Sequence, residues 1–228
     1  MNYRKTSHVS STAPKFGLFS QFAAVARALG HPHRLELLEH LAQGERSVEA
    51  LAERVGVSIA NASQHLHQLR RAGLVASRRD GKYVLYRLGD ESVLALVALL
   101  RQFAERNIAE VDRIVRSYFA ARDGMEPVSR QELLERSRAG LVTVLDVRPA
   151  DEFALGHLPG AVNIPQQQLD ARLAELDPAQ EIVAYCRGAY CVLSYEAVAL
   201  LRERGFKARR LEDGFPEWRT GGLEVSVG

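Results

Sequence analysis

The sequence predicts two domains, a mainly α domain followed by an α/β domain with a parallel sheet. The chain has 228 residues, 46% of them hydrophobic and 25% charged, which is enough for two globular domains of ordinary size. Its charge is divided: residues 1–124 carry 18 Lys and Arg against 12 Asp and Glu, and residues 125–228 carry 12 against 16. The apolar pattern also changes at the Gly and Pro residues of 121–127, from helical spacing to alternating strands and helices.

The basic half contains two predicted helices separated by a short turn, as in a helix-turn-helix. Gly56 ends the first helix, and Ser58 is a suitable N-cap for the second. The predicted buried faces are Val48, Leu51 and Val55 in the first helix, and Ile59, Ala62, Leu66 and Leu69 in the second.

The second of these helices carries polar residues beside its apolar stripe, and Asn and Gln side chains can bind adenine in a bidentate manner. Two strand-like runs around Asp80-Gly81 then predict a hairpin with a basic tip suited to phosphates. An ordinary helical hairpin would also have a polar face, but the ordered series of turn, capped helix and basic hairpin favours DNA binding. The predicted DNA-binding residues are Ser58, Ala60, Asn61, Ser63, Gln64, His67, Arg78, Arg79 and Lys82.

Residues 22–92, including "ALGHPHRLELLEHL" and "LRRAGLVASRRDGKYVLYRL", resemble the ArsR-type winged-helix repressors. The resemblance implies a homodimer that binds double-stranded operator DNA. It also implies that the apolar segment Ser92–Phe119 joins the first helix in the dimer interface, although an ordinary core helix would show the same periodicity. The apolar residues of that segment are Leu96, Leu99, Leu100, Phe103, Ile114 and Val115.

The chain departs from many members of that family in its metal ligands. Those members bind metals through cysteines on the helix before the recognition helix, or through His and carboxylates on the C-terminal helix. The helix from Ser47 has no Cys, and Ser92–Phe119 has neither Cys nor His. We therefore expect no metal site and no cofactor, and a signal that enters elsewhere.

The acidic half reads as an α/β domain. The runs "LVTVLDV" (141–147) and "EIVAYC" (181–186) predict buried parallel strands. Between the linker and the first strand, Ser129 and Glu132 are spaced for a capping box, and Gly140 marks the helix end.

Three segments of this half, in order, resemble the signatures of a rhodanese domain: "VLDVRPADEFALGHLPGAVNIP", "VAYCRGAYC" and "LEDGFPEWRTGGLEV". The resemblance covers essentially residues 127–228 and implies a sulfurtransferase fold in which Cys186 holds a persulfide. It also implies that Asp146, Arg148 and Glu152 brace the loop network. A phosphatase loop of this design would need an Arg where this chain has Val192, so phosphate-ester chemistry is disfavoured.

Cys186 and Cys191 are the two cysteines of the chain. A cysteine between a parallel strand and a helix lies at the sheet edge where α/β folds bind ligands, and loop amides there stabilise a thiolate. Cys191 would attack a persulfide on Cys186, which either releases sulfide and closes an intraloop disulfide or traps a short polysulfide bridge. The predicted anion or persulfide cradle is Arg187, Gly188, Ala189, Tyr190 and Val192, with Arg187 attracting thiosulfate, polysulfide or persulfide donors.

The leading interpretation is a cytoplasmic repressor that senses reactive sulfur species or oxidants through both cysteines. We expect no signal peptide and no membrane contact, and thiols that stay reduced in the cytoplasm rather than a stable disulfide. Two alternatives remain: an active sulfurtransferase tethered to a DNA-binding domain, and an arsenite- or soft-metal-responsive repressor. The expected boundaries are a disordered tail at 1–15, the ArsR-type domain at 16–120, a linker at 121–127 and the rhodanese-like domain at 128–228.

Overall fold

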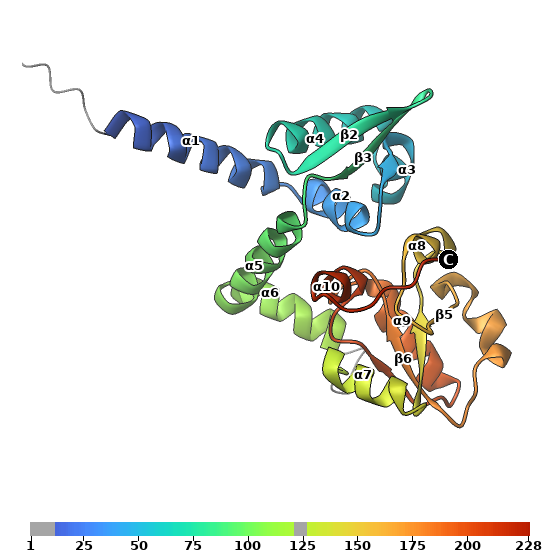
Figure 1. Cartoon of the computed structure of the whole chain (residues 1–228). Helices are drawn as coiled ribbons and strands as arrows, with labels where there is room; N and C mark the ends of the chain where they lie inside the picture. Colours follow the sequence, from blue (N-terminus) through green and yellow to red (C-terminus); the bar gives the residue numbers. More distant parts are fainter. Residues whose placement is uncertain (1–11, 121–126) are drawn as a thin grey trace, which may run out of the picture. The chain divides into compact units, whose positions relative to one another are not determined.

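The computed structural model describes residues 12–120 and 127–228 (Figure 1). This part of the chain forms two compact units. The first contains the described residues up to Leu38 together with Arg46–Asp90, and the second contains Glu39–Glu45 and Glu91–Gly228. The expected boundary near residue 120 therefore differs from the packing, since the helices after Asp90 group with the second unit.

The first unit contains the predicted helix-turn-helix. Its helices are α1 (Thr12–Leu29), α2 (Pro32–Ala42, whose last residues group with the second unit), α3 (Val48–Val55) and α4 (Ile59–Arg71). The side chain of Ser47 caps α3, and Gly56 ends it in the left-handed conformation, with φ 68°. Ser58 caps α4 through its bond to the backbone of Asn61.

A small antiparallel sheet completes this unit as a wing. Its strands are β1 (Arg46–Ser47), β2 (Val75–Asp80) and β3 (Tyr83–Leu88), in the order β1-β3-β2. Asp80 pairs with Tyr83, so Gly81 and Lys82 form the predicted hairpin turn. The φ of 58° at Gly81 suits a residue without a Cβ.

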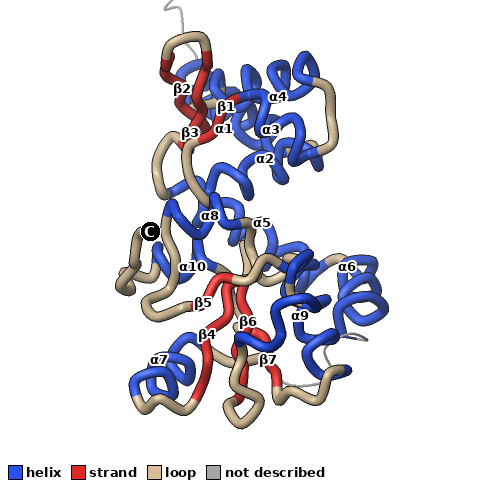
Figure 2. Tube along the Cα trace, turned by 90° about the vertical axis from the view of Figure 1, so that its right-hand side faces the viewer, coloured by secondary structure: helices blue, strands red, loops and turns tan. Residues whose placement is uncertain are grey.

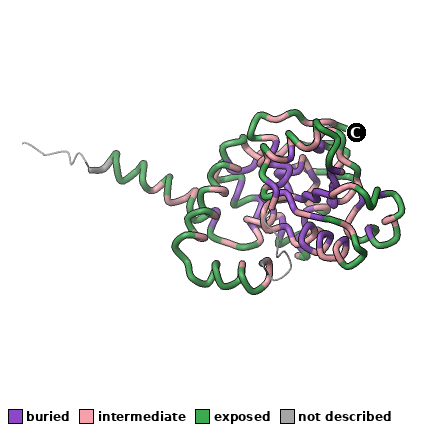
Figure 3. Tube along the Cα trace, turned by 90° about the horizontal axis from the view of Figure 1, so that it is seen from below, coloured by how far each residue is buried: buried purple, intermediate pink, exposed green. Residues whose placement is uncertain are grey.

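Two expectations for the first unit need correction. Ile59 was expected on the buried face of α4 but is 53% exposed, because the helix begins there and the core lies under later turns. Residues 12–15 were expected in a disordered tail but belong to α1, and residues 1–11 of that tail lie outside the described residues. Helix α1 is exposed along most of its length, as Figure 3 shows.

The segment Ser92–Phe119 is helical but interrupted. Helix α5 (Ser92–Asn107) ends at Ile108, whose extended backbone separates it from α6 (Ala109–Ile114). A π-helical turn, η1 (Val115–Ala120), follows directly. The apolar residues Leu96, Leu99, Leu100, Phe103 and Ile114 remain exposed on these helices.

A parallel sheet forms the centre of the second unit, as predicted (Figure 2). Its strands are β4 (Val142–Asp146), β5 (Val162–Asn163), β6 (Glu181–Tyr185) and β7 (Ala208–Arg210), in the order β5-β4-β6-β7. The connecting elements are α7 (Arg130–Arg138), α8 (Ala150–Leu155), η2 (Gln166–Gln168), η3 (Asp170–Glu175), α9 (Val192–Glu203) and α10 (Phe215–Thr220).

Residues of β6 alternate between the two faces of the sheet. Ile182 and Ala184 pack in one apolar cluster with residues of α9, whereas Val183 and Tyr185 pack in the other with residues of α7 and α10. Both clusters are continuous and buried, so the sheet is covered on both faces.

The predicted capping box at the start of α7 is half formed. Ser129 accepts a hydrogen bond from the backbone of Glu132 at 3.2 Å, but the Glu132 carboxylate binds Arg136 and Arg209. No helix among the described residues is both long and apolar enough to cross a membrane.

A substitution at Gly56 tests whether the turn between α3 and α4 depends on a left-handed residue at that position. A Cβ at Gly56 would meet no atom within 4 Å, so Gly56→Ala is opposed only by the left-handed backbone. We expect a loss of about 1–2 kcal/mol in the free energy of unfolding, measured by urea denaturation of the full chain. Gly17→Ala is the control: Gly17 also has open space but lies in helix α1, where alanine should stabilise by about 0.5–1 kcal/mol. Equal effects of the two substitutions would contradict this explanation.

Candidate functional site

Helix α4 gathers the predicted base-reading side chains on one side. Ser58 lies at its start, where the hydroxyl accepts a hydrogen bond from the backbone N of Asn61 at 3.2 Å. The opposite side is buried through Ala62, Leu66 and Leu69. Of the residues predicted to contact DNA, Ser58, Ala60, Asn61, Gln64 and His67 are exposed and Ser63 is half-buried.

Arg34 holds α4 in place, a role that the sequence analysis missed. Its guanidinium donates to the carbonyls of Ala28 at 2.5 Å and Arg27 at 2.8 Å, in the last turn of α1. It also donates to the side-chain carbonyl of Gln68 on α4. A single buried cation therefore joins the end of α1, where carbonyls lack helical partners, to the recognition helix. Its sequence signal was weak, because one arginine in a helix that also contains glutamates and histidines looks like an ordinary surface cation.

His65, also missed, lies on the buried side of α4 against the start of α2. Its ring centroid is 4.4 Å from that of His31, and His33 is nearby at 5.9 Å. Burial, followed by the charges of His31, Arg34 and His33, lowers the pKa of His65. The neutral imidazole therefore packs as part of the core.

The wing carries the three basic residues expected at its tip. Arg78, Arg79 and Lys82 are exposed, and Arg78 Nη1 lies 3.2 Å from Asp80 Oδ2. This pair is exposed on both sides, so it contributes little to stability and does not prevent a phosphate from approaching. Arg70 of α4 donates to Ser77 of β2 at 3.1 Å, which links the helix to the wing.

The cysteine loop follows β6 in the second unit. Cys186 comes directly after the strand, and Cys191 is the N-cap residue of α9. The two cysteines are joined by a disulfide with a Cα to Cα distance of 6.1 Å, and both are buried. The structure therefore contains the oxidised pair, whereas the sequence analysis expected both thiols to stay reduced. The Cα to Cα distance does fit the intraloop disulfide that the proposed attack of Cys191 would form.

The loop backbone is folded back on itself. Gly188 accepts a hydrogen bond from the N of Cys191 at 3.1 Å, and the Cys191 carbonyl accepts one from the hydroxyl of Ser194 at 2.9 Å. Ala189 accepts one from the hydroxyl of Tyr195 at 3.1 Å. All five predicted cradle residues, Arg187, Gly188, Ala189, Tyr190 and Val192, are therefore in or beside one closed turn.

Arg187 has a buried acidic partner. Its Nε and Nη2 donate to the Glu152 carboxylate at 2.9 Å each, and Glu152 is fully buried. The Arg187 side chain is only 13% exposed. The Glu152 carboxylate compensates the positive charge of Arg187, which was expected to attract anionic sulfur donors. The pair also links α8 to the cysteine loop.

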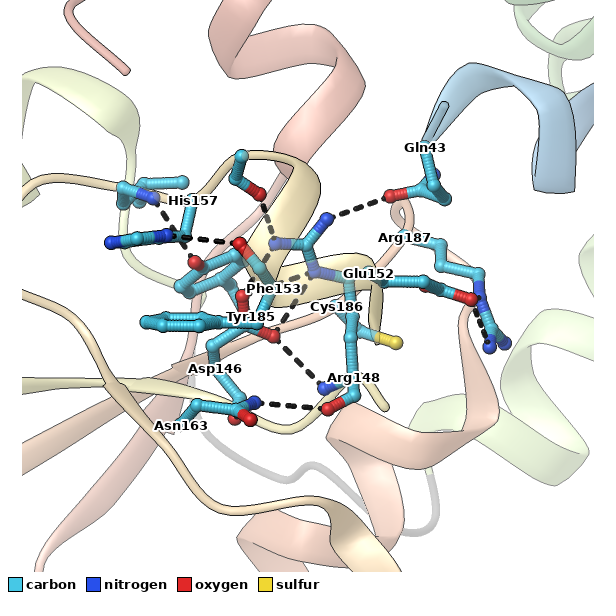
Figure 4. Close-up of polar contacts among 12 residues, drawn as sticks. Gln43, Asp146, Arg148, Glu152, Phe153, His157, Asn163, Tyr185, Cys186 and Arg187 are labelled. Atoms are coloured by element: carbon cyan, nitrogen blue, oxygen red, sulfur yellow. Dashed lines mark hydrogen bonds and ion pairs between the residues drawn. The ribbon is translucent and has the colours of Figure 1, made fainter. Parts of the chain in front are cut away.

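Behind the loop lies a fully buried ion pair, drawn in Figure 4. The guanidinium of Arg148 contacts both carboxylate oxygens of Asp146 and donates to the carbonyl of Gly156 at 2.8 Å. Its Nη1 donates to the side chain of Gln43, in the segment of residues 39–45 that belongs to the same unit, at 2.9 Å. Burial alone would lower the pKa of Arg148, but the bonds to Asp146 and its charge outweigh burial and raise that pKa.

Tyr185 closes the other side of this cluster. Its hydroxyl accepts a hydrogen bond from the backbone of Leu158 at 3.1 Å. Burial, and then the charge of Asp146, raise the pKa of Tyr185, so the phenol stays protonated. The bracing roles expected for Asp146, Arg148 and Glu152 agree with this geometry.

Gly214 supports the loop by having no side chain. A Cβ there would overlap the backbone of Arg187 and Gly188. The next residue, Phe215, donates its backbone N–H to the carbonyl of Cys186 at 3.0 Å. The turn before α10 therefore lies directly against the cysteine loop.

The described residues contain no group of three His, Cys, Asp or Glu side chains that could hold a metal ion. The arrangement offers instead two sulfur atoms within bonding reach in a closed loop, and separately a helix and a hairpin with exposed polar and basic side chains.

Two family models match the chain. A helix-turn-helix domain matches residues 29–78, and a rhodanese-like domain matches residues 129–220. These ranges contain α4 and the cysteine loop, respectively.

Known proteins resemble the whole chain and its parts. The HTH-type transcriptional regulator Rv0324 of Mycobacterium tuberculosis is 44% identical over 94% of each chain. The solution structure of the homodimeric winged helix-turn-helix DNA-binding domain Mb0332 from Mycobacterium bovis is 37% identical, with a TM-score of 0.39, over 47% of this chain and 94% of that chain. A rhodanese-related protein from Thermoplasma volcanium is 26% identical, with a TM-score of 0.41, over 46% of this chain and 100% of that chain.

The relative that matches along nearly the whole length decides the family. Its identity of 44% extends over both the helix-turn-helix and the rhodanese-like region. The chain therefore belongs to the HTH-type transcriptional regulators, as a member that joins a helix-turn-helix DNA-binding domain to a rhodanese-like domain.

Proposed function

We propose that this regulator is a dimeric repressor whose DNA affinity depends on the sulfur state of Cys186 and Cys191. One observation carries the proposal: both cysteines of a transcriptional regulator lie in one rhodanese-like loop and reach each other there. A transcriptional regulator acts on DNA, so the cytoplasmic location expected from the sequence stays part of the proposal.

The operator is bound by α4 and the wing. Asn61 and Gln64 are exposed amides suited to base edges in the major groove, and Arg79 and Lys82 suit backbone phosphates. Residues 1–124 have a net charge of +6, which favours a polyanionic partner.

The homodimer is formed through the exposed apolar face of α5. Leu96, Leu99 and Phe103 recur at helical spacing and remain uncovered in the single chain. A two-fold axis would place two copies of α4 on half-sites about one helical turn apart.

The sulfur chemistry requires both thiols. A thiolate at Cys186 attacks the sulfane sulfur of thiosulfate, which forms a persulfide and releases sulfite. The Cys191 thiolate then attacks the Cys186 sulfur, which forms the disulfide and releases the outer sulfur as hydrosulfide. The two thiols lose two electrons and the transferred sulfur gains them. Polysulfides and low-molecular-weight persulfides react in the same way, with a shorter sulfur chain or a thiol as the leaving group.

A working sulfurtransferase is the second candidate, because the rhodanese-like model matches the domain and Cys186 lies at the strand end. In that case the persulfide must reach an external acceptor before Cys191 attacks it. Steady-state release of sulfite from thiosulfate with an added thiol acceptor would support catalysis, whereas a single turnover per chain supports a sensor. The arsenite-responsive alternative would need a third ligand from outside the described residues of one chain.

Substitutions on α4 and the wing should have different effects on DNA binding. Gln64→Ala should reduce discrimination at one base pair by about 1–3 kcal/mol, whereas Arg79→Ala should weaken binding to all sequences and flatten its salt dependence. Fluorescence anisotropy with operator variants at several salt concentrations measures both effects. Arg138→Ala, an exposed arginine at the end of α7, removes the same charge and should change neither property. Unchanged binding in both test variants would show that α4 and the wing do not read DNA.

The dimer interface can be tested with two matched leucines. Leu99 on α5 is 61% exposed and Leu141 before β4 is 59% exposed. Leu99→Glu should give a monomer in analytical ultracentrifugation because it places a charge in the apolar interface, and it should weaken operator binding. Leu141→Glu should remain a dimer. A wild-type monomer, or a dimeric Leu99→Glu variant, would place the interface elsewhere.

The two cysteines should have separate roles. Cys186→Ser should abolish persulfide formation and the DNA response, whereas Cys191→Ser should accumulate a persulfide on Cys186 and form no intraloop disulfide. Site-resolved mass spectrometry after polysulfide treatment, combined with operator titration, measures both outcomes. Because Cys186 is 1% exposed and Cys191 is 7% exposed, access alone does not select Cys186. First modification at Cys191 would reverse the assignment.

A further inference from the structure

Tyr190 lies inside the ring that the disulfide closes. The ring runs from Cys186 to Cys191, and Tyr190 directly precedes the second cysteine. The backbone position of Tyr190 is therefore constrained when the disulfide is present and less constrained when both thiols are free. Its side chain is half-buried and contacts residues outside the loop.

The first of these contacts is aromatic. Phe119, in the π-helical turn η1, has its ring centroid 5.1 Å from that of Tyr190. The same phenylalanine lies edge-on to Tyr195 at 4.8 Å, and the hydroxyl of Tyr195 binds the loop carbonyl of Ala189. Phe119 therefore packs against two aromatic residues associated with the cysteine loop, at distances typical of favourable ring pairs.

The second contact is polar and reaches α5. The Tyr190 hydroxyl lies beside the carboxylate of Glu105, to which it can donate a hydrogen bond. Burial first, and then this bond and the charge of Glu105, raise the pKa of Tyr190 to about 12, so the phenol stays a donor at physiological pH.

Arg101, one turn earlier on α5, extends this contact to the other side of the loop. Its guanidinium lies 3.4 Å from Glu105 and 3.4 Å from Glu217. Glu217 accepts a hydrogen bond from the backbone of Gly214 at 3.2 Å, and Gly214 lies against the loop backbone. Helix α5 therefore approaches the loop directly at Tyr190, through Glu105, and indirectly at Gly188, through Arg101, Glu217 and Gly214.

The apolar residues of α5 lie on its other face. At about 100° per residue, Arg101 and Glu105 fall roughly 150° to 170° from the direction shared by Leu96, Leu99 and Phe103. The helix thus contacts the cysteine loop with one face and leaves an exposed apolar face on the opposite side.

We propose that Tyr190 is the positioning residue that couples the sulfur state of the Cys186 and Cys191 pair to helix α5. In the disulfide form, the closed ring holds Tyr190 against Glu105 and Phe119. Reduction opens the ring, the loop gains freedom, and these contacts weaken. Coupling is reciprocal, so the same contacts stabilise the disulfide relative to the two thiols. The consequence for operator binding rests on the proposed function, whereas the coupling itself does not.

The test is the redox equilibrium of the full-length protein in glutathione buffers. Glutathione disulfide accepts two electrons from the two thiols, which yields the intraloop disulfide and two molecules of glutathione. We expect Tyr190→Ala to lower the equilibrium constant for disulfide formation by about fivefold or more, within the usual range of coupling between sites. Thiol alkylation followed by intact-mass measurement gives the oxidised fraction.

Three further variants separate coupling from general loss of packing. Tyr190→Phe keeps the ring against Phe119, so its equilibrium constant for disulfide formation should lie between those of Tyr190→Ala and the wild type. Phe119→Leu removes the aromatic partner of Tyr190 in η1 and should also lower the equilibrium constant for disulfide formation. Leu141→Ala, at the opposite end of the sheet from the cysteines, should leave it unchanged. If Tyr190→Ala does not fold, the comparison of Tyr190→Phe with wild type decides, since loss of the Glu105 bond alone should still lower the constant.

Hydrogen exchange of α5 gives the reciprocal measurement. In the wild type, α5 amides should exchange more slowly in the oxidised than in the reduced protein, and Tyr190→Ala should remove that difference. An equilibrium constant unchanged in every Tyr190 variant, or α5 exchange equal in both wild-type states, would overturn the proposal. If the coupling is present but operator affinity is the same in both states, the coupling stands and the proposed sensing function fails.

Discussion

The buried ion pair between Asp146 and Arg148 organises the carboxyl edge of the parallel sheet. Arg148 donates its backbone N–H to Asp146 at 2.9 Å and its side chain to the carbonyl of Gly156, beyond α8. Asn163 on β5 donates to the carbonyls of both Asp146 and Arg148 at 3.0 Å. Two charges fully removed from water are tolerated only where such additional hydrogen bonds surround them. The pair therefore fixes the ends of β4 and β5 and the position of α8.

The cysteine loop depends on that edge. Helix α8 supplies Glu152, whose buried carboxylate binds Arg187. On the other side, Gly214 and Phe215 lie against the loop backbone. These supports restrain the first part of the loop, so a change of sulfur state is expected to move its second part, around Tyr190. A sensor of sulfur state needs this combination: one part of the loop held in place, and another part that adopts different arrangements in the reduced and oxidised states.

The helix-turn-helix unit is also organised by a buried charge. Arg34 satisfies carbonyls at the end of α1 and binds Gln68, on the helix that carries the predicted base-reading residues. A rigid base is required there, because base recognition depends on side chains held at fixed positions along the groove. Polar groups buried with all their bonds made thus define the geometry in both units.

The sequence by itself determined the local elements and the order of the domains. The helices α3 and α4, the helix end at Gly56, the cap at Ser58 and the hairpin around Gly81 follow from the identities of adjacent residues. The parallel strands β4 and β6, and the place of Cys186 at a strand end, follow from short apolar runs in the same way. Capping, turn chemistry and periodicity act over a few residues, so they can be recognised without knowledge of the fold.

The tertiary structure alone decided which distant side chains meet. Arg187 was expected to attract anions, but Glu152, 35 positions earlier, compensates its charge. The contacts of Tyr190 with Glu105 and Phe119 join segments more than 70 positions apart that have no common sequence pattern. Ile59 is exposed, and Ile108 interrupts a segment with continuous helical periodicity. Burial and pairing depend on what the rest of the fold brings against each residue, and periodicity along the chain carries no information about that partner.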